Sequence, residues 1–306
     1  MGSKVGGSST DKDLDKETPQ KNEKEVFEEG SEQLKLETIL KELDVLIGLD
    51  NIKAEVQELI NFLKVQQVRK SRNLPTPNLS LHVVFYGNPG TGKTTVARML
   101  SKIYKALGIL SKGHLIETDR SGMVAGYVGQ TALKVSDAVE QSLGGVLFVD
   151  EAYSLTDNDE GGFGREAVDT LIKAMEDHRG DLAVVIAGYT KNMQNFLSSN
   201  PGLKSRFNRY WEFKDYTPPE LFKIFLSLCS TGHYLLSDPA KRKLAILLQK
   251  TCDQKDETFG NGRLVRNLYE ATISNQASRI VLHENMSDDV LTTIDASDIP
   301  DDITSL

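Results

Sequence analysis

The feature that most constrains this chain is a glycine-rich segment at residues 87–94, which reads GNPGTGKT. It fits the pattern G-x-x-x-x-G-K-[ST] at every fixed position, and it lies between an apolar run at 81–86 and a helical run at 95–100. Glycines in such a loop let backbone N–H groups face an anion, and the helix that follows adds partial positive charge at the same point. The segment therefore predicts a strand, a phosphate-binding loop and a helix that together hold a nucleoside triphosphate.

The loop residues have distinct expected roles. Lys93 is expected to reach the β- and γ-phosphates, and the Thr94 hydroxyl is expected to hold Mg²⁺. ATP and Mg²⁺ are accordingly the expected ligands. Further contacts are expected from the rest of the loop, which consists of Gly87, Asn88, Pro89, Gly90, Thr91 and Gly92.

A second motif follows an apolar run at 145–149, which ends in Asp150 and Glu151. In a nucleotide-binding α/β sheet, a carboxylate at the C-terminal end of a strand lies beside the phosphate loop. Asp150 is expected to bind Mg²⁺ through its water shell. Glu151 is expected to accept a proton from the attacking water, or to orient it.

Continuous apolar runs alternate with helical patterns between residues 81 and 213. Strands of this kind are buried on both faces, which is typical of a parallel sheet covered by helices. The predicted fold class is therefore α/β, a P-loop NTPase sheet flanked by helices and followed by a small all-helical domain. The predicted strands are 81–86, 114–118, 145–150, 182–187 and 211–213, and the predicted helices are 50–72 (with Asp50 as N-cap), 93–107, 130–143, 164–178, 218–231, 237–252 and 261–282.

Composition and Pro218-Pro219 divide the chain into four predicted parts. These are a disordered polar tail at 1–33, an α/β nucleotide-binding domain at 34–216, a helical domain at 217–285 and an acidic C-terminal tail at 286–306. The net charge of −8 lies at the two ends, because residues 281–306 carry 7 Asp/Glu and no Lys/Arg. The middle of the chain is weakly positive, which does not fit a general nucleic-acid binder.

The two motifs, together with an arginine-bearing segment before a helical domain, resemble the AAA+ ATPases. Over roughly residues 40–280, the chain is similar to one subfamily, which contains the red-type Rubisco activases, the stage V sporulation protein K-like ATPases and the ATPases of type VII secretion. The segments that carry this resemblance are 121–132, 144–153, 187–189 and 199–207. The resemblance implies a Mg²⁺-dependent ATPase that works as a ring, with six subunits expected, and remodels a protein client.

The resemblance also assigns residues around the nucleotide. Ile47 and Gly48 match the segment that packs on the adenine. Arg206 matches the arginine finger that points into the neighbouring subunit's site, where a guanidinium stabilises the charge on the transferred phosphoryl group. Arg209 is the alternative finger, and a surface ion pair remains the alternative role for Arg206.

Two further assignments from the resemblance are less specific. Arg263 matches the lid arginine called sensor 2, and Arg266, about one helical turn later, competes for this role. A polar residue after the strand 182–187 holds the attacking water in the wider superfamily, commonly as Asn. Thr190 is the best match by count, although the local sequence departs from the family pattern.

The segment Tyr127, Val128 and Gly129 matches the family's pore loop. An aromatic side chain on a loop flanked by glycines can grip a passing polypeptide without reading its sequence. The acidic, glycine-rich segment 156–164 could line the same pore or form a solvated loop. An aromatic at the pore position favours a polypeptide over nucleic acid as the client.

The remaining composition narrows the function further. Cys229 and Cys252 are the two cysteines, and the five histidines show no metal-ligand spacing, so no zinc site is predicted. Few cysteines and no apolar run of about 20 residues predict a cytoplasmic protein that does not cross a membrane. A nucleic-acid motor, or a nucleotide switch that assembles with little turnover, remains the alternative function.

Overall fold

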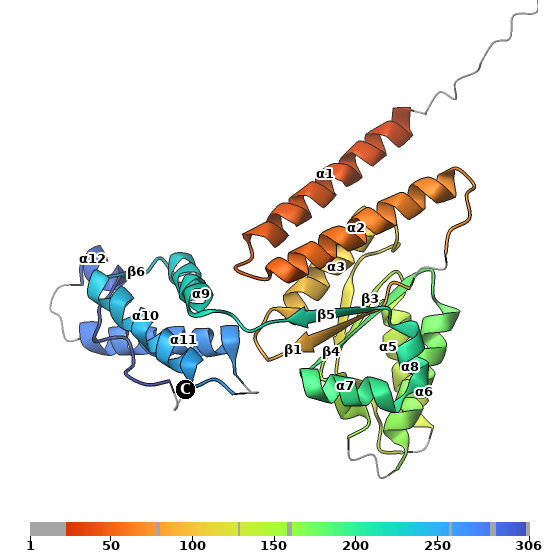
Figure 1. Cartoon of the computed structure of the whole chain (residues 1–306). Coiled ribbons are helices and arrows are strands. Elements are labelled where there is room, and N and C mark those ends of the chain that lie inside the picture. The colour runs from red at the N-terminus through yellow and green to blue at the C-terminus, as the bar shows by residue number, and fades with distance from the viewer. Residues whose placement is uncertain are drawn as a thin grey trace, which may run out of the picture.

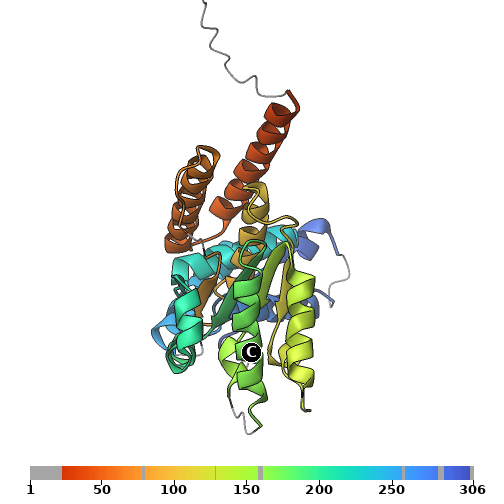
Figure 2. The same ribbon diagram turned by 90° about the vertical axis from the view of Figure 1, so that its right-hand side faces the viewer.

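The computed structural model describes residues 23–303 except 78–79, 128, 158–160, 257–258 and 282–285, and it describes no side chains in 23–33. Most of the expected N-terminal tail, residues 1–22, lies outside these residues. The first helix, α1, begins at Glu23, eleven residues before Leu34, where the nucleotide-binding domain was predicted to begin. In Figure 1, α1 extends beyond the body of the molecule, and Figure 2 shows the same from a second side.

The centre of the fold is a five-stranded parallel sheet, which confirms the predicted α/β class (Figure 1). Its strand order is β2-β3-β4-β1-β5, so β1 lies between β4 and β5. Because all strands run in one direction, their carboxyl ends meet at one edge, where ligands bind in such folds. The strands are β1 (Val83–Gly87), β2 (Leu115–Thr118), β3 (Gly145–Val149), β4 (Leu182–Gly188) and β5 (Arg209–Phe213).

Alternate side chains of each strand enter two separate cores, one on each face of the sheet. On the first face, Phe85 stacks on Trp211 and touches Phe213, with ring centroids 5.3 and 4.9 Å apart. On the second face, Val84, Leu147 and other strand residues pack among a different set of helices. The first face is covered by α1 (Glu23–Val45), α2 (Asp50–Ser71) and α3 (Lys93–Ala106), and the second by α5 (Gln130–Ser142), α6 (Phe163–Asp177), α7 (Thr190–Ser199) and α8 (Pro201–Arg206).

Several local expectations differ from the structure. The N-cap of α2 is Leu49, in a left-handed conformation with φ 61°, and Asp50 is the first residue of the helix. The helices α7 and α8 were not predicted, because both are short and Pro201 separates their patterns. Two further short turns, α4 (Arg120–Met123) and the 3₁₀ helix η1 (Ala152–Leu155), also lie outside the predicted helices.

The C-terminal part of the chain forms the lid, seen in cyan and blue in Figure 1. It follows a short connection after β5, and its core joins that of the first sheet face. The lid is not all-helical, since β6 pairs with β7 in a small parallel sheet. Its elements are α9 (Pro218–Thr231), β6 (Leu235–Leu236), α10 (Asp238–Asp253), α11 (Asn261–Ile280), α12 (Asp288–Thr292) and β7 (Thr293–Ile294).

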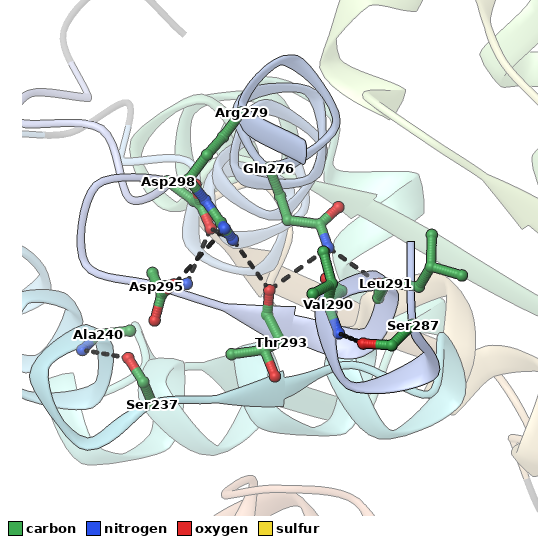
Figure 3. A network of polar contacts seen from close by, with 10 residues as sticks. All are labelled: Ser237, Ala240, Gln276, Arg279, Ser287, Val290, Leu291, Thr293, Asp295 and Asp298. Atoms are coloured by element: carbon green, nitrogen blue, oxygen red, sulfur yellow. Dashed lines mark hydrogen bonds and ion pairs between the residues drawn. The ribbon is translucent and has the colours of Figure 1, made fainter. Parts of the chain in front are cut away.

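The prediction of an acidic tail at 286–306 is wrong for the described residues up to 303. Ile294, Ile299 and Ile303 are buried in the lid core. The acidic side chains between them are not all solvated: Asp298 is only 1% exposed, and Arg279 donates to its two carboxylate oxygens at 2.7 and 2.8 Å (Figure 3). The acidic composition predicted a solvated tail, but the buried isoleucines of this segment pack it against the lid.

Replacing Arg279 with methionine should destabilise the lid by about 3 kcal/mol, because Asp298 would stay buried without its counter-charge. Urea unfolding of the whole chain measures this loss. Lys241→Met is the matched control, since it removes an exposed ion pair with Asp238 on α10 and should change the stability much less. Equal losses in the two variants would contradict a structural role for the Arg279 pair.

Within the residues that the structure describes, no helix is both long enough and apolar enough to cross a membrane.

Candidate nucleotide-binding site

A cavity of about 850 Å³ opens at the carboxyl edge of the sheet, between the sheet and the lid. Its walls bring together segments that are far apart in the sequence. They include the loop after β1, the end of β3, the connection before α2, and helices α9 and α11 of the lid. The cavity thus collects the predicted phosphate loop, both predicted carboxylates and both candidate lid arginines.

The phosphate loop has the backbone that its glycines predict. A Cβ atom on Gly87 would lie 2.1 Å from the Phe213 carbonyl oxygen, and one on Gly90 would lie 2.2 Å from that of Gly260. Thr91 is buried, and its hydroxyl donates to the Asn88 carbonyl at 2.8 Å, which closes the loop from within. Any larger residue at the two glycines would push apart the loop and its neighbours.

Lys93 begins α3 and turns back over the loop. Its Nζ donates to the carbonyl oxygens of Gly87 and Asn88, both at 2.8 Å. Burial lowers the pKa of Lys93 to about 8, against the opposing attraction of Asp150. An ammonium that has lost its water gains most from a nearby anion, so this arrangement fits a bound phosphate.

The carboxylates at the end of β3 face the same cavity. The Glu151 N–H donates to Asp150 Oδ1 at 3.0 Å. Glu151 adopts the left-handed conformation with φ 47°, which is uncommon for residues other than glycine and is often found at functional sites. Thr94 also lines the cavity, so a hydroxyl and two carboxylates, which are oxygen donors of the kind Mg²⁺ prefers, meet there.

The apolar end of the cavity is made by the connection before α2 and by the lid. Ile47 lines it as expected, whereas Gly48 does not and instead forms the turn, with φ 63°. Sequence reasoning missed the opposite wall, which consists of Tyr216, Ile224 and Leu228. Tyr216 follows β5, whereas Ile224 and Leu228 lie on α9, where apolar residues at helical spacing gave no sign of ligand contact.

The lid touches the phosphate loop directly. The Gly262 N–H at the start of α11 donates to the Gly90 carbonyl at 3.0 Å. Asp215, in the connection between sheet and lid, accepts from Asn88 at 2.9 Å and from Asn261 at 2.8 Å through the same Oδ1 atom. Through these hydrogen bonds, a movement of the loop would therefore also displace the start of α11.

Both candidate lid arginines, Arg263 and Arg266, line the cavity, so the structure leaves both open. Thr190 is the first residue of α7 and is not part of the cavity lining. The preceding residues Gly188 and Tyr189 form that wall instead. Thr190 stays a prediction for the residue that holds the attacking water.

The candidate arginine fingers lie away from their own cavity. Arg206 ends α8, and its carbonyl accepts from the Ser80 hydroxyl at 2.7 Å, before β1 begins. The phosphate loop follows the other end of β1, roughly 15 Å away for five strand residues. Arg209 donates to the Ser80 carbonyl at 3.2 Å and lies 5.3 Å from the ring of Phe62, so it is held against α2.

Tyr127 is 72% exposed and lies just before α5. Gly129 has φ 78°, a conformation that suits glycine, while Val128 lies outside the described residues. The base of this segment is fixed by Lys134, whose Nζ donates to the carbonyls of Ser121 and Val124 at 2.9 and 3.1 Å. The exposed Tyr127 side chain thus follows a segment whose backbone is hydrogen-bonded to α5 through Lys134.

Comparison with known families decides what the cavity is. Residues 83–215 match the family described as "ATPase family associated with various cellular activities (AAA)", and residues 217–306 match the AAA lid domain. The chain belongs to the AAA ATPase family. As an AAA ATPase it binds and hydrolyses ATP, which confirms the enzyme class predicted from the motifs.

Curated relatives cover most of the same length. The AAA ATPase is 42% identical over 265 residues to stage V sporulation protein K of Bacillus subtilis (strain 168), covering 86% of this chain and 82% of the relative. It is 39% identical over 271 residues to the chloroplastic ribulose bisphosphate carboxylase/oxygenase activase of Cyanidioschyzon merolae, covering 87% and 92%. The subfamily resemblance predicted from the motifs is thereby confirmed.

Among solved structures, a point mutant of RuvB from Thermotoga maritima is similar to the AAA ATPase with a TM-score of 0.53 and 21% identity, covering 81% of this chain and 70% of that one. At this identity the likeness concerns the fold alone. It agrees with the parallel sheet and the separate lid described above.

Proposed function

We propose that this AAA ATPase hydrolyses ATP at sites shared between neighbouring subunits of a ring, and that it uses the resulting movement to remodel a protein client. The position of Arg206 carries this proposal. Its backbone lies near the start of β1, whereas the phosphate loop follows the end of that strand. An arginine side chain reaches about 7 Å at full extension, so Arg206 can serve a phosphate of another subunit but not its own.

Each residue at the cavity has a proposed role in hydrolysis. Lys93 and the backbone N–H groups of the loop bind the β- and γ-phosphates. Thr94 and Asp150 hold Mg²⁺, which, when bound, neutralises charge on the phosphate oxygens. Glu151 orients the attacking water and accepts its proton.

The lid reports the state of the nucleotide in this proposal. Arg263 or Arg266 contacts the γ-phosphate of its own subunit. Asp215 joins the phosphate loop to the start of α11 through Asn88 and Asn261, so a shift in the loop turns the lid. In a ring, a turning lid moves the neighbouring subunit.

Assembly is the first consequence to test. Specific ATPase activity should rise with protein concentration as the oligomer forms. The molecular mass of the assembly, measured at each concentration, reports how much oligomer is present. Constant activity per chain from monomer to oligomer would exclude a shared site and leave a self-contained nucleotide switch.

The client is a polypeptide in this proposal, because the exposed group at the proposed pore is the aromatic Tyr127. Relatives differ in what their names state, since one is a sporulation protein and another an activase of ribulose bisphosphate carboxylase/oxygenase. Only the second name states a protein on which the relative acts, so the names leave the client of this chain open.

Replacing Tyr127 with alanine should leave ATP hydrolysis within about twofold of the wild type, because Tyr127 is not part of the cavity lining. Loss of the aromatic surface should weaken binding of an unfolded polypeptide about tenfold or more. Fluorescence anisotropy of labelled, unfolded casein with ATP present measures this binding. Tyr210→Ala, which removes an exposed tyrosine on β5, is the matched control. Unchanged casein binding by the Tyr127 variant would exclude the pore-loop role.

A further inference from the structure

Arg206 shares its ionic partner with a second arginine. Glu176 on α6 meets both through one atom, Oε2: Arg206 Nη2 lies 3.6 Å from it, and Arg179 Nη2 donates a hydrogen bond to it. All three side chains are partly exposed, at 47% for Glu176, 40% for Arg179 and 27% for Arg206. Two cations therefore compete for one carboxylate oxygen at the protein surface.

Arg206 is incompletely satisfied in this position. Its Nη1 donates to the Gly202 carbonyl at a long 3.3 Å. Its Nε is buried, and within the described part of the chain it finds no hydrogen-bond partner. A buried donor without a partner is unfavourable, so the resting position of this guanidinium is one that it can readily leave.

The floor below the three side chains adds no charge at neutral pH. His82 is buried, and its Nδ1 accepts from the Val184 N–H at 3.0 Å. Burial, followed by the nearby Arg179 and Arg206, lowers the pKa of His82 to about 4. His82 is thus neutral and does not compete with the arginines for Glu176.

We propose that Arg179 is a positioning residue for Arg206, which keeps Glu176 paired when Arg206 leaves for the γ-phosphate of the neighbouring subunit. This inference rests on the proposed trans-acting role of Arg206. With Arg179 present, departure of Arg206 leaves no carboxylate without a counter-charge. Without Arg179, Glu176 would hold Arg206 alone and more strongly, so fewer fingers would reach the neighbouring site.

This arrangement determines whether each substitution should lower or restore kcat. Arg179→Ala should lower kcat about two- to fivefold, the range expected for one exposed ion pair, with little change in KM. Adding Glu176→Gln to Arg179→Ala removes the excess hold on Arg206 and should recover most of the lost kcat. A guanidinium that contacted phosphate itself could not be replaced by removing a carboxylate.

The experiment measures kcat and KM of the assembled enzyme for the wild type, Arg179→Ala, Glu176→Gln and the double variant, with melting temperatures for all. Lys173→Ala, an exposed cation one turn earlier on α6, is the control and should stay within about twofold. An unchanged kcat in Arg179→Ala would overturn the inference. So would a double variant as slow as Arg179→Ala; with an unchanged melting temperature, that result would instead indicate a direct contact between Arg179 and phosphate.

An Arg206→Ala arm separates this inference from the function on which it rests. If Arg206→Ala is inactive while Arg179→Ala is unchanged, only the positioning role fails. If Arg206→Ala retains full activity, the shared site fails, and the positioning role fails with it. A merely structural role for Arg179 would lower the melting temperature without any recovery of kcat in the double variant.

Discussion

An Arg206→Ala variant is expected to hydrolyse ATP about 10³- to 10⁵-fold more slowly than the wild type once both are assembled. The guanidinium would otherwise stabilise charge that develops on the phosphoryl group of the neighbouring subunit. Because Arg206 lies outside its own cavity, affinity of the isolated subunit for ATP should be little changed. Steady-state ATPase assays and binding of a fluorescent ATP analogue measure the two quantities, with Lys204→Ala on the same helix as the control.

Mixing two inactive variants tests whether the arginine acts in trans. Lys93→Ala should fail to bind ATP but still supply Arg206, whereas Arg206→Ala should bind ATP but lack the finger. Mixed rings should therefore recover part of the activity that each variant lacks alone. Activity that stays at the level of the separate variants, although mass measurement shows mixed assemblies, would exclude a shared site.

The parts of this molecule that could be predicted from the sequence are those determined by short, consecutive stretches of residues. Three of the five strands, β1, β3 and β4, are continuous apolar runs, and the phosphate loop is a motif of eight consecutive residues. The cavity at the carboxyl edge followed from these two facts, because parallel strands deliver their ends to one place. No long-range contact had to be known.

The parts that were missed depend on contacts between distant segments. Asp215 bonds to Asn88, 127 positions away, and to Asn261, 46 positions away, so nothing near it in sequence marks it. The short run Gly260-Asn261-Gly262 could have drawn attention, since Asn261 has φ 48° and the two glycines approach the loop closely. Arg179 lies only three positions after Glu176, and its proposed role became visible only when folding placed Arg206 beside the same carboxylate.

The other differences between the predictions and the structure have equally specific causes. Seven acidic residues in 281–306 outweighed three well-spaced isoleucines, although burial of the isoleucines and the pairing of Asp298 decide the structure. Thr190 was chosen by counting from β4; α7 begins at that residue and its neighbour Tyr189 lines the cavity, so the residue that holds the water stays a prediction. In both cases the sequence pattern alone does not show which of its residues become buried or line the cavity, because tertiary packing decides this.

Replacing Glu151 with glutamine is expected to lower kcat about 10²- to 10⁴-fold while ATP still binds. Glutamine keeps the size of the side chain but cannot accept the proton of the attacking water. The lysine, loop and oxygen donors that are proposed to hold the phosphates are untouched, so ATP should accumulate on the enzyme. Single-turnover hydrolysis with labelled ATP separates the chemical step from binding, and Glu140→Gln on the exposed side of α5 is the matched control.

The backbone of Glu151 makes this variant more informative than a simple loss of activity. Its left-handed conformation, with the N–H held by Asp150, aims the side chain from a fixed position at the end of β3. Glutamine at 151 keeps that backbone, so a slow enzyme with normal ATP affinity would assign the loss to the carboxylate itself. Near-normal turnover would instead place the water-activating group elsewhere on the cavity wall, and Tyr189, which lines that wall beside β4, would be the next residue to replace.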